Sequence, residues 1–142
     1  MPQKGTKGAK GMRTEKGIFA LVDKLRQIGY ELHQYLRHGH LEKVYENGMV
    51  HRSRKAGIEI EQQHPLKVYD TDGTTLGEYI ADIFAEKSLL VELKAVKRLP
   101  DEHTAQLPGY MRACRVEHGL LMNFGAPKFE VRKFILSDVS GS

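Results

Sequence analysis

The stretch of sequence that decides the fold is GEYIADIFAEKSLLVELKAV, residues 77–96. Apolar residues dominate two runs within and around it, 76–85 and 89–97, and the most polar point between the runs is Lys87. Two apolar runs of this length around a polar break are typical of antiparallel strands joined by a tight turn. We therefore predict a β-hairpin that turns about Lys87.

The position of the turn fixes which residues of the hairpin face one another. Opposite residues have numbers that sum to 174, so Asp82 lies across from Glu92 and Ile80 across from Lys94. One face is almost wholly apolar and is expected to face the core: Tyr79, Ala81, Ile83, Ala85, Leu89, Val91, Leu93 and Ala95. The opposite face holds two carboxylates and an amine among apolar neighbours: Glu78, Ile80, Asp82, Phe84, Leu90, Glu92, Lys94 and Val96.

Two carboxylates that face each other at a Cβ separation of about 5 Å repel, and this repulsion lowers stability. A bound Mg²⁺ or Mn²⁺ ion would offset it, because both ions prefer oxygen ligands and are often held by one or two carboxylates. Lys94 emerges on the same face as Glu92, since strands have a period of two. It could orient or help to deprotonate an attacking water and stabilise charge on a phosphoryl group. The alternative is a solvated Glu92–Lys94 charge pair beside an ordinary exposed Asp82.

The segments around the hairpin predict an α+β domain built on one sheet. Residues 18–36 and about 41–55 have the apolar spacing of amphipathic helices, and Tyr45 falls on the apolar stripe of the second, which favours a place in the core. A strand pattern follows Gly57 up to a turn at 70–73. A helix is expected over 101–115, with Pro108 as an irregularity, and two further strands over 117–123 and 128–136.

Composition and charge bound the class of protein. The length of 142 residues fits one domain, which we place at 18–137, between a basic Gly-rich tail (1–17) and a short C-terminal tail (138–142). The net charge of +4 lies in the first tail, because residues 18–142 hold 17 basic and 17 acidic side chains. A single cysteine and the lack of a leader favour a reducing, cytoplasmic setting, and no apolar run approaches the roughly 20 residues of a membrane span.

Two other chemistries have little support in the sequence. The seven histidines show neither H-E-x-x-H nor cysteine-paired spacing, which argues against a structural zinc site. No G-x-x-x-x-G-K-[ST] segment is present, so ATP hydrolysis is not indicated.

Five short motifs occur in a fixed order along the chain. They are Gly39-His40-Leu41-Glu42-Lys43-Val44-Tyr45, a G-x-x-E-x-x-Y signature, then Gly77 to Asp82, Val91 to Val96, Ala105-Gln106-Leu107 with Tyr110, and Leu121 to Gly125. Taken in this order, the motifs resemble the GxxExxY proteins, a family grouped with the PD-(D/E)XK nuclease superfamily. The resemblance covers roughly residues 20–136.

The resemblance implies a restriction-endonuclease-like αβββαβ core, with a mixed central sheet flanked by helices. It implies that Asp82, Glu92 and the backbone carbonyl of Leu93 bind a metal ion, and that Lys94 serves the nucleophilic water. Glu42 matches a helical acid that joins the metal shell or its water network, although it could simply be a first-turn acid that favours the helix dipole.

A further element implied by the resemblance lies in the helix predicted over 101–115. Gln106 and Tyr110 are similar to a Q-x-x-x-Y element that helps to position substrate, and at i and i+4 they would share one helix face. Pro108-Gly109 between them departs from the helix-favouring residues that are usual there.

The leading hypothesis is therefore a nuclease that depends on Mg²⁺ or Mn²⁺ and hydrolyses phosphodiester bonds in nucleic acid, with DNA as the favoured substrate. The alternative is a non-catalytic nucleic-acid-binding or protein-interaction module on the same fold. The intact set of Asp82, Glu92 and Lys94 favours the nuclease, whereas the balanced charge of residues 18–142 favours the module. A homodimer is suggested by analogy alone, because nucleases that cut both strands often pair two sites.

Overall fold

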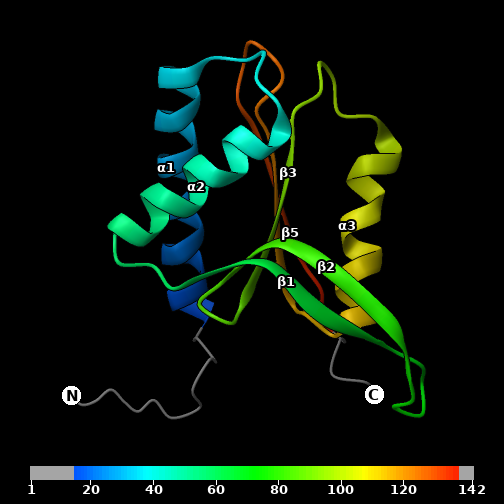
Figure 1. Ribbon diagram of the computed structural model, residues 1–142. Helices are drawn as coiled ribbons and strands as arrows, with labels where there is room; N and C mark the ends of the chain where they lie inside the picture. Colours follow the sequence, from blue (N-terminus) through cyan, green and yellow to red (C-terminus); the bar gives the residue numbers. More distant parts are fainter. Residues whose placement is uncertain (1–14, 138–142) are drawn as a thin grey trace, which may run out of the picture.

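The computed structural model describes residues 15–137, which form a three-layer α/β/α arrangement (Figure 1). The elements in chain order are α1 (Glu15–Leu36), α2 (Glu42–Lys55), β1 (Ile60–Tyr69), β2 (Thr75–Ala85), β3 (Leu89–Lys94), α3 (Asp101–Cys114), β4 (His118–Asn123) and β5 (Glu130–Ile135). Helices α1 and α2 lie on one side of the sheet and α3 lies on the other. Helix α1 begins three residues before its predicted start; the rest of the predicted basic tail and the predicted tail 138–142 lie outside the described residues.

The five strands form one mixed sheet in the order β1-β2-β3-β4-β5. Neighbouring strands are antiparallel except β3 and β4, which are parallel and are connected through α3. A parallel pair requires such a crossover, because its strands cannot be joined by a tight turn. The expected α+β class and mixed sheet flanked by helices are confirmed.

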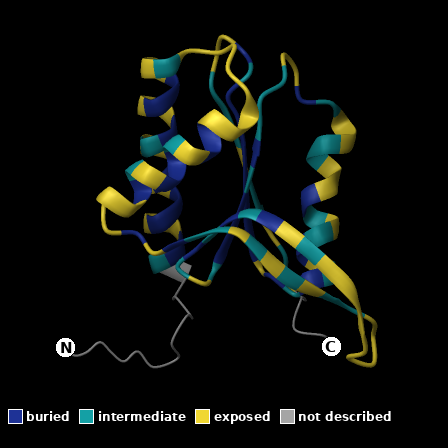
Figure 2. Cartoon of the chain, viewed as in Figure 1, coloured by how far each residue is buried: buried dark blue, intermediate teal, exposed yellow. Residues whose placement is uncertain are grey.

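Each face of the sheet is buried by a separate hydrophobic core. The larger core packs α1 and α2 against the sheet, and its members include Ile18, Leu25, Tyr45, Met49, Val91 and Leu120. The smaller core packs α3 against the other face, around Leu90, Leu107, Met111 and Leu121. Figure 2 shows that the central strands are buried and that the far end of the β1–β2 ribbon is exposed. Strands β3 and β4 are therefore largely buried on both faces, as expected for strands covered on both sides.

The predicted core face of the β2–β3 hairpin is only partly correct. Its members nearest the turn, Ile83, Ala85, Leu89, Val91 and Leu93, pack in the α1–α2 core as expected. Tyr79 and Ala81 instead pack on the opposite face of the sheet, in the α3 core. The physical reason is the curvature of the β1–β2 ribbon, which sweeps from the α1–α2 side to beneath α3.

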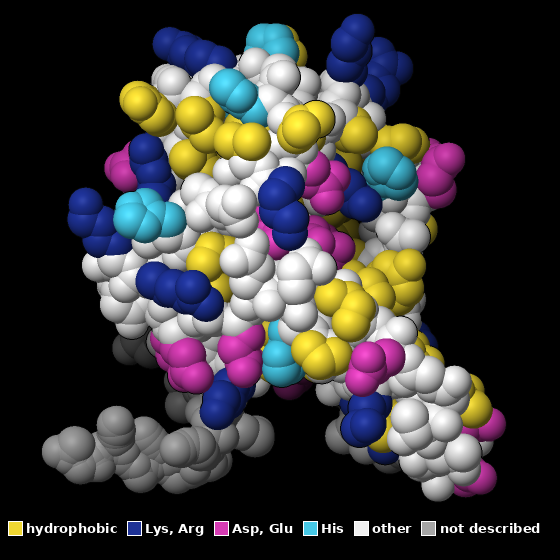
Figure 3. Space-filling view, viewed as in Figure 1, with side chains coloured by type: hydrophobic (Ala, Val, Ile, Leu, Met, Phe, Trp, Pro, Cys, Tyr) yellow, Lys and Arg dark blue, Asp and Glu magenta, His cyan; other side chains and the backbone are white. Residues whose placement is uncertain are grey.

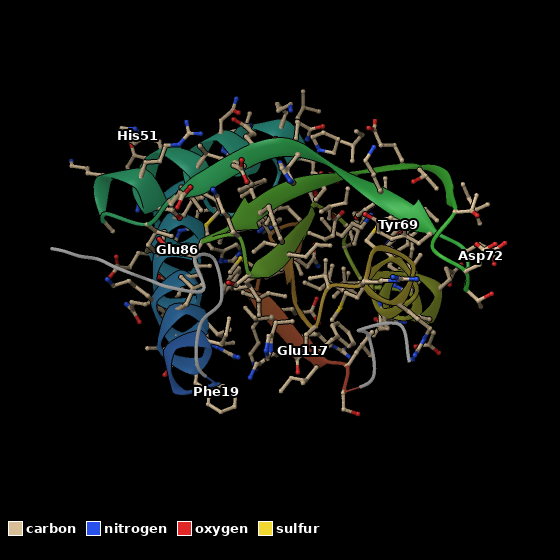
Figure 4. All side chains as sticks on the ribbon, turned by 90° about the horizontal axis from the view of Figure 1, so that it is seen from below. Phe19, His51, Tyr69, Asp72, Glu86 and Glu117 are labelled. Atoms are coloured by element: carbon tan, nitrogen blue, oxygen red, sulfur yellow. The ribbon has the colours of Figure 1, made fainter. Side chains whose placement is uncertain are left out.

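The curvature of this ribbon is visible from below. Figure 4 shows Glu86, in the turn after β2, and Asp72, in the turn before it, at opposite ends of the ribbon, with Tyr69 beside α3. Arg115, the residue after α3, holds that far end through a contact of its guanidinium with the Tyr69 ring and a hydrogen bond to the Asp70 carbonyl.

Candidate active site

The two predicted catalytic strands separate at the residues expected to face each other. Strands β2 and β3 pair at Ala85–Leu89, Phe84–Leu90 and Ile83–Val91, which is the predicted register. The ladder ends there, so the expected pairs Asp82–Glu92 and Ile80–Lys94 do not form, and Ile80 pairs with Pro65 of β1 instead. We call this divergence of β2 from β3, at Asp82 and Glu92, the strand fork.

Asp82 belongs to neither neighbouring ladder. On its β1 side the pairs run from Gln62–Ile83 directly to His64–Ala81, so Asp82 is unpaired there as well. Its carboxylate Oδ2 accepts a hydrogen bond from the Leu93 N–H at 2.9 Å, and its own N–H donates to Glu92 Oε2 at 3.1 Å. Each carboxylate therefore accepts a hydrogen bond from a backbone N–H of the other strand, as a backbone carbonyl does in a regular sheet. These two hydrogen bonds hold the carboxylates close together.

The environment of the fork raises the pKa of both carboxyl groups. Burial, followed by the charge of Asp82, raises the pKa of Glu92 to about 7. Burial also raises the pKa of Asp82, against the hydrogen bond from Leu93 and the positive charge of Lys94. A positive charge placed between two partly buried carboxylates would stabilise their ionised forms and offset their mutual repulsion.

Lys94 is held at the fork through its backbone. Its carbonyl accepts the Phe124 N–H at 2.9 Å, and two residues later the Val96 N–H donates to Asn123 Oδ1 at 3.0 Å while the Val96 carbonyl accepts Asn123 Nδ2 at 2.9 Å. Strand β4 ends at Asn123, as its predicted range 117–123 implies, and a turn follows. This turn continues the β3–β4 contact beyond the last strand pair and fixes the segment that carries Lys94.

Helix α2 brings Glu42 to the fork. The side chain is exposed in the first turn of the helix, yet partial desolvation of its carboxylate and the charge of Asp82 raise its pKa, and the charge of Lys94 lowers it. The fully buried Tyr45, three residues on, stacks on Phe124 at 4.8 Å and hydrogen bonds to the Arg37 carbonyl, which confirms that it is a core residue.

The sequence prediction missed a second acid of α2, Glu46, which is only 3% exposed. Its charge is the largest electrostatic cause that raises the pKa of Asp82, after burial. The signal was available, since Glu46 follows Glu42 by four residues and so shares its helix face. This spacing is a weak signal, because a glutamate on a helix is usually solvated, and so Glu46 was not singled out.

Helix α3 reaches the fork through a stacked pair of tyrosines. Gln106 Nε2 donates to the Tyr110 hydroxyl at 3.1 Å, so the two share a helix face as predicted, and the helix continues through Pro108. The Tyr110 ring stacks on Tyr79 at 4.0 Å between centroids. Burial and the charge of Glu92 raise the pKa of the Tyr79 hydroxyl. Tyr79, which the sequence placed in the core, therefore stacks on Tyr110 and lies within the electrostatic influence of Glu92.

The chemistry of the fork fits an oxygen-bound divalent cation. Within residues 15–137, no three Asp, Glu, His or Cys side chains form a ready-made metal cage. Mg²⁺ and similar ions need no such cage, because they are commonly held by one or two carboxylates with water and substrate phosphate as the other ligands. Asp82 and Glu92 supply the two carboxylates, and a cation would offset the burial and the neighbouring acidic charges that raise their pKa values.

The face of the molecule shown in Figure 3 carries both charged and apolar side chains. Acidic and basic side chains meet near the middle of the face shown in Figure 3, with hydrophobic side chains around them. The exposed apolar residues near the predicted site in sequence are Leu41 (79% exposed) and Val44, beside Glu42, and Ile80 (45% exposed), beside Asp82.

Among the described residues, no helix has both the length and the apolar character needed to cross a membrane.

Comparison with known proteins agrees with the architecture. The model of the PD-(D/E)XK nuclease superfamily matches residues 20–134, which include the fork and both α2 and α3. The crystal structure of SSO0001 is similar in fold, with a TM-score of 0.53 and 19% sequence identity over 70% of this chain and 52% of that one, so the chain spans about half the length of that protein. No curated protein matches the chain. The chain belongs to the PD-(D/E)XK nuclease superfamily.

Proposed function

We propose that this protein is a nuclease that depends on a divalent metal ion, Mg²⁺ or Mn²⁺, and hydrolyses phosphodiester bonds in nucleic acid. The observation that carries the proposal is the convergence of Asp82 and Glu92 at the strand fork, with Lys94 close enough to lower the pKa of both carboxyl groups. Membership of a nuclease superfamily supports the same chemistry. The alternative, a simple Glu92–Lys94 charge pair, would not require each carboxylate to accept a backbone N–H of the opposite strand.

Each residue has a distinct role in this proposal. Asp82 and Glu92 would hold the metal ion, together with the carbonyl of Leu93, and Glu42 would join the metal shell or its water network. The ion, when bound, supplies positive charge that activates water and stabilises the phosphoryl oxygens. A water oxygen forms the new bond to phosphorus as the bond to the leaving sugar oxygen breaks. Lys94 orients that water and stabilises the charge on the phosphoryl group.

The class of substrate follows from the same surface. Gln106 and Tyr110 position the nucleic acid beside the fork, supported by the stack of Tyr110 on Tyr79. We propose DNA as the first substrate to test. We also propose that the protein is cytoplasmic. We propose further that it belongs to the GxxExxY group, whose signature is carried by Glu42 and Tyr45. A homodimer would let two such sites act on the two strands of a duplex.

A cleavage assay tests the proposal. Labelled single- and double-stranded DNA and RNA are incubated with the protein and Mg²⁺, Mn²⁺ or EDTA. We expect cleavage that requires the metal and that falls by at least about 100-fold in Glu92→Ala, which removes a metal ligand, and in Lys94→Ala, which removes a group that acts on the reacting phosphate. The matched control is Lys97→Ala, which removes an exposed lysine beyond the end of β3.

Two results would contradict the assignment. Cleavage that survives both substitutions would place the activity elsewhere, and a complete lack of cleavage on all four substrates would favour the non-catalytic module. The balanced charge of residues 18–142 makes that module the second candidate. It predicts that nucleic acid or a protein partner binds equally well in EDTA.

A further inference from the structure

We infer that Glu46 is a positioning residue of the strand fork, which works with Gln62 and Gln63 of β1 to fix α2, and with it Glu42, against Asp82. This inference rests on the proposed function, because it assigns a role in the same site. We call the three side chains the carboxylate lock.

The lock is a set of hydrogen bonds between a helix and a strand. Glu46 Oε2 accepts from Gln62 Nε2 at 2.6 Å and from Gln63 Nε2 at 3.1 Å, and Glu46 Oε1 accepts from Gln63 Nε2 at 3.2 Å. Lys43, exposed on the same helix, adds a contact to Oε2 at 3.1 Å. A carboxylate has about four lone-pair sites, so little capacity remains for a direct contact with a metal ion or substrate.

The lock engages β1 at the level of Asp82. Gln62 pairs with Ile83 and His64 pairs with Ala81, so Gln63 is the β1 residue that lies opposite Asp82, and both are outside the ladder. Gln63 has a φ of 53°, in the left-handed region that residues other than glycine rarely adopt. Backbone strain of this kind persists only where surrounding contacts enforce it, and such positions cluster at functional sites.

A purely structural role does not explain the choice of residues. Glu46 is almost fully buried, where a carboxylate is costly unless its oxygens are hydrogen-bonded. An apolar residue would anchor α2 to β1 without this cost. The hydrogen bonds instead set the height and rotation of α2, whose first turn carries Glu42 four residues away. Groups that orient the ligands of a metal site typically change its affinity or activity by about 10–100-fold when they are replaced.

The test compares substitutions that break the lock with one that rebuilds it. In Glu46→Gln the new amide N–H₂ meets the amide of Gln63, donor against donor. In Gln63→Asn the left-handed backbone is retained, because asparagine tolerates it, but the shorter side chain loses its reach. We expect each to weaken Mn²⁺ binding by the full-length protein, measured by calorimetry without nucleic acid, and to lower kcat, both by about tenfold or more.

The double variant Glu46→Gln/Gln63→Glu exchanges the two groups and restores a donor–acceptor match between positions 46 and 63. We expect it to recover most of the Mn²⁺ affinity and of kcat. Assays are run at a temperature at which circular dichroism shows each variant to be folded, and Gln63→Asn carries the test if Glu46→Gln fails to fold. The control is Glu59→Gln, which neutralises an exposed glutamate just before β1 whose only ion-pair contact is with Lys87 at 4.0 Å among the described residues.

Two outcomes would overturn the inference. Single variants that bind Mn²⁺ and cleave like wild type would show that the lock serves folding alone. A folded double variant with no recovery would show that the charge at position 46, and not its hydrogen bonds, is used. Failure of the proposed function gives a different result: either the wild-type protein does not cleave, or Glu92→Ala cleaves as well as wild type.

Discussion

Glu92 is partly buried beside a second carboxylate, that of Asp82, and these two causes raise its pKa to about 7. Its ordinary value is near 4.5, so between these two pH values the folded protein holds a proton that the unfolded chain releases. The stabilising contribution is therefore complete below about pH 4.5 and is lost as the pH rises through about 7. In the absence of a metal ion, the fork makes the fold less stable at neutral pH than at mildly acidic pH.

The substitution Glu92→Gln should remove this dependence. We expect the variant to gain free energy of unfolding relative to wild type as the pH rises from 5 to 8. The gain is at most about 3 kcal/mol, because one pKa unit corresponds to about 1.4 kcal/mol. Urea unfolding at both pH values in EDTA measures it. If the difference in free energy of unfolding between the two proteins stays constant from pH 5 to 8, Glu92 is not desolvated as described.

At the scale of elements, the contact between the end of β3 and the turn after β4 decides where Lys94 lies. This turn approaches the β3 backbone so closely at Gly125 that a Cβ atom there would fall against the Val96 nitrogen and the Ala95 carbonyl carbon. Backbone atoms of two packed segments cannot move aside as a flexible side chain could. Glycine is therefore required at this position for steric reasons, although its φ is not positive.

Gly125→Ala should accordingly destabilise the protein and displace Lys94. We expect a loss of at least about 1–3 kcal/mol in the free energy of unfolding, the usual range for overpacking, together with reduced cleavage at temperatures where the protein remains folded. Gly77→Ala is the matched control, because an added Cβ there meets no atom within 4 Å. Equal urea midpoints for the two variants would contradict the close approach.

At the scale of the whole molecule, the positive charge is separated from the folded domain. Residues 18–142 are formally neutral, while Lys4, Lys7, Lys10 and Arg13 precede the described residues without an acidic neighbour among residues 1–14. Affinity for a phosphate backbone depends on such charges through the release of counterions. The salt dependence of nucleic-acid binding should therefore arise mainly outside residues 15–137.

Deletion of residues 1–14 tests this separation. We expect weaker binding at low salt and a slope of log affinity against log salt that is shallower by up to about 3.6, from four charges at about 0.7–0.9 each. Fluorescence anisotropy between 50 and 200 mM salt measures the slope. Replacement of the same four residues by glutamine in the full chain is the control for charge against length. An unchanged slope in both would assign the phosphate contacts to the folded domain.

The sequence by itself determined the elements, the hairpin register and the identity of the acids and lysine at the fork. These features are local: helix and strand periods appear in short windows, and the turn at Lys87 sets the pairing of residues on both sides of it. The order of five short motifs added the superfamily, which the match over residues 20–134 confirms.

Only the tertiary structure decided where the ladder ends, which face Tyr79 occupies and which acid of α2 is buried. Each of these depends on segments distant in sequence. Strand β1 draws β2 away from β3, α3 covers Tyr79, and Gln62 with Gln63 binds Glu46 from 16 or 17 residues along the chain. A pattern of single residues cannot encode such contacts, because the same glutamate or tyrosine would be solvated or buried according to what packs on it.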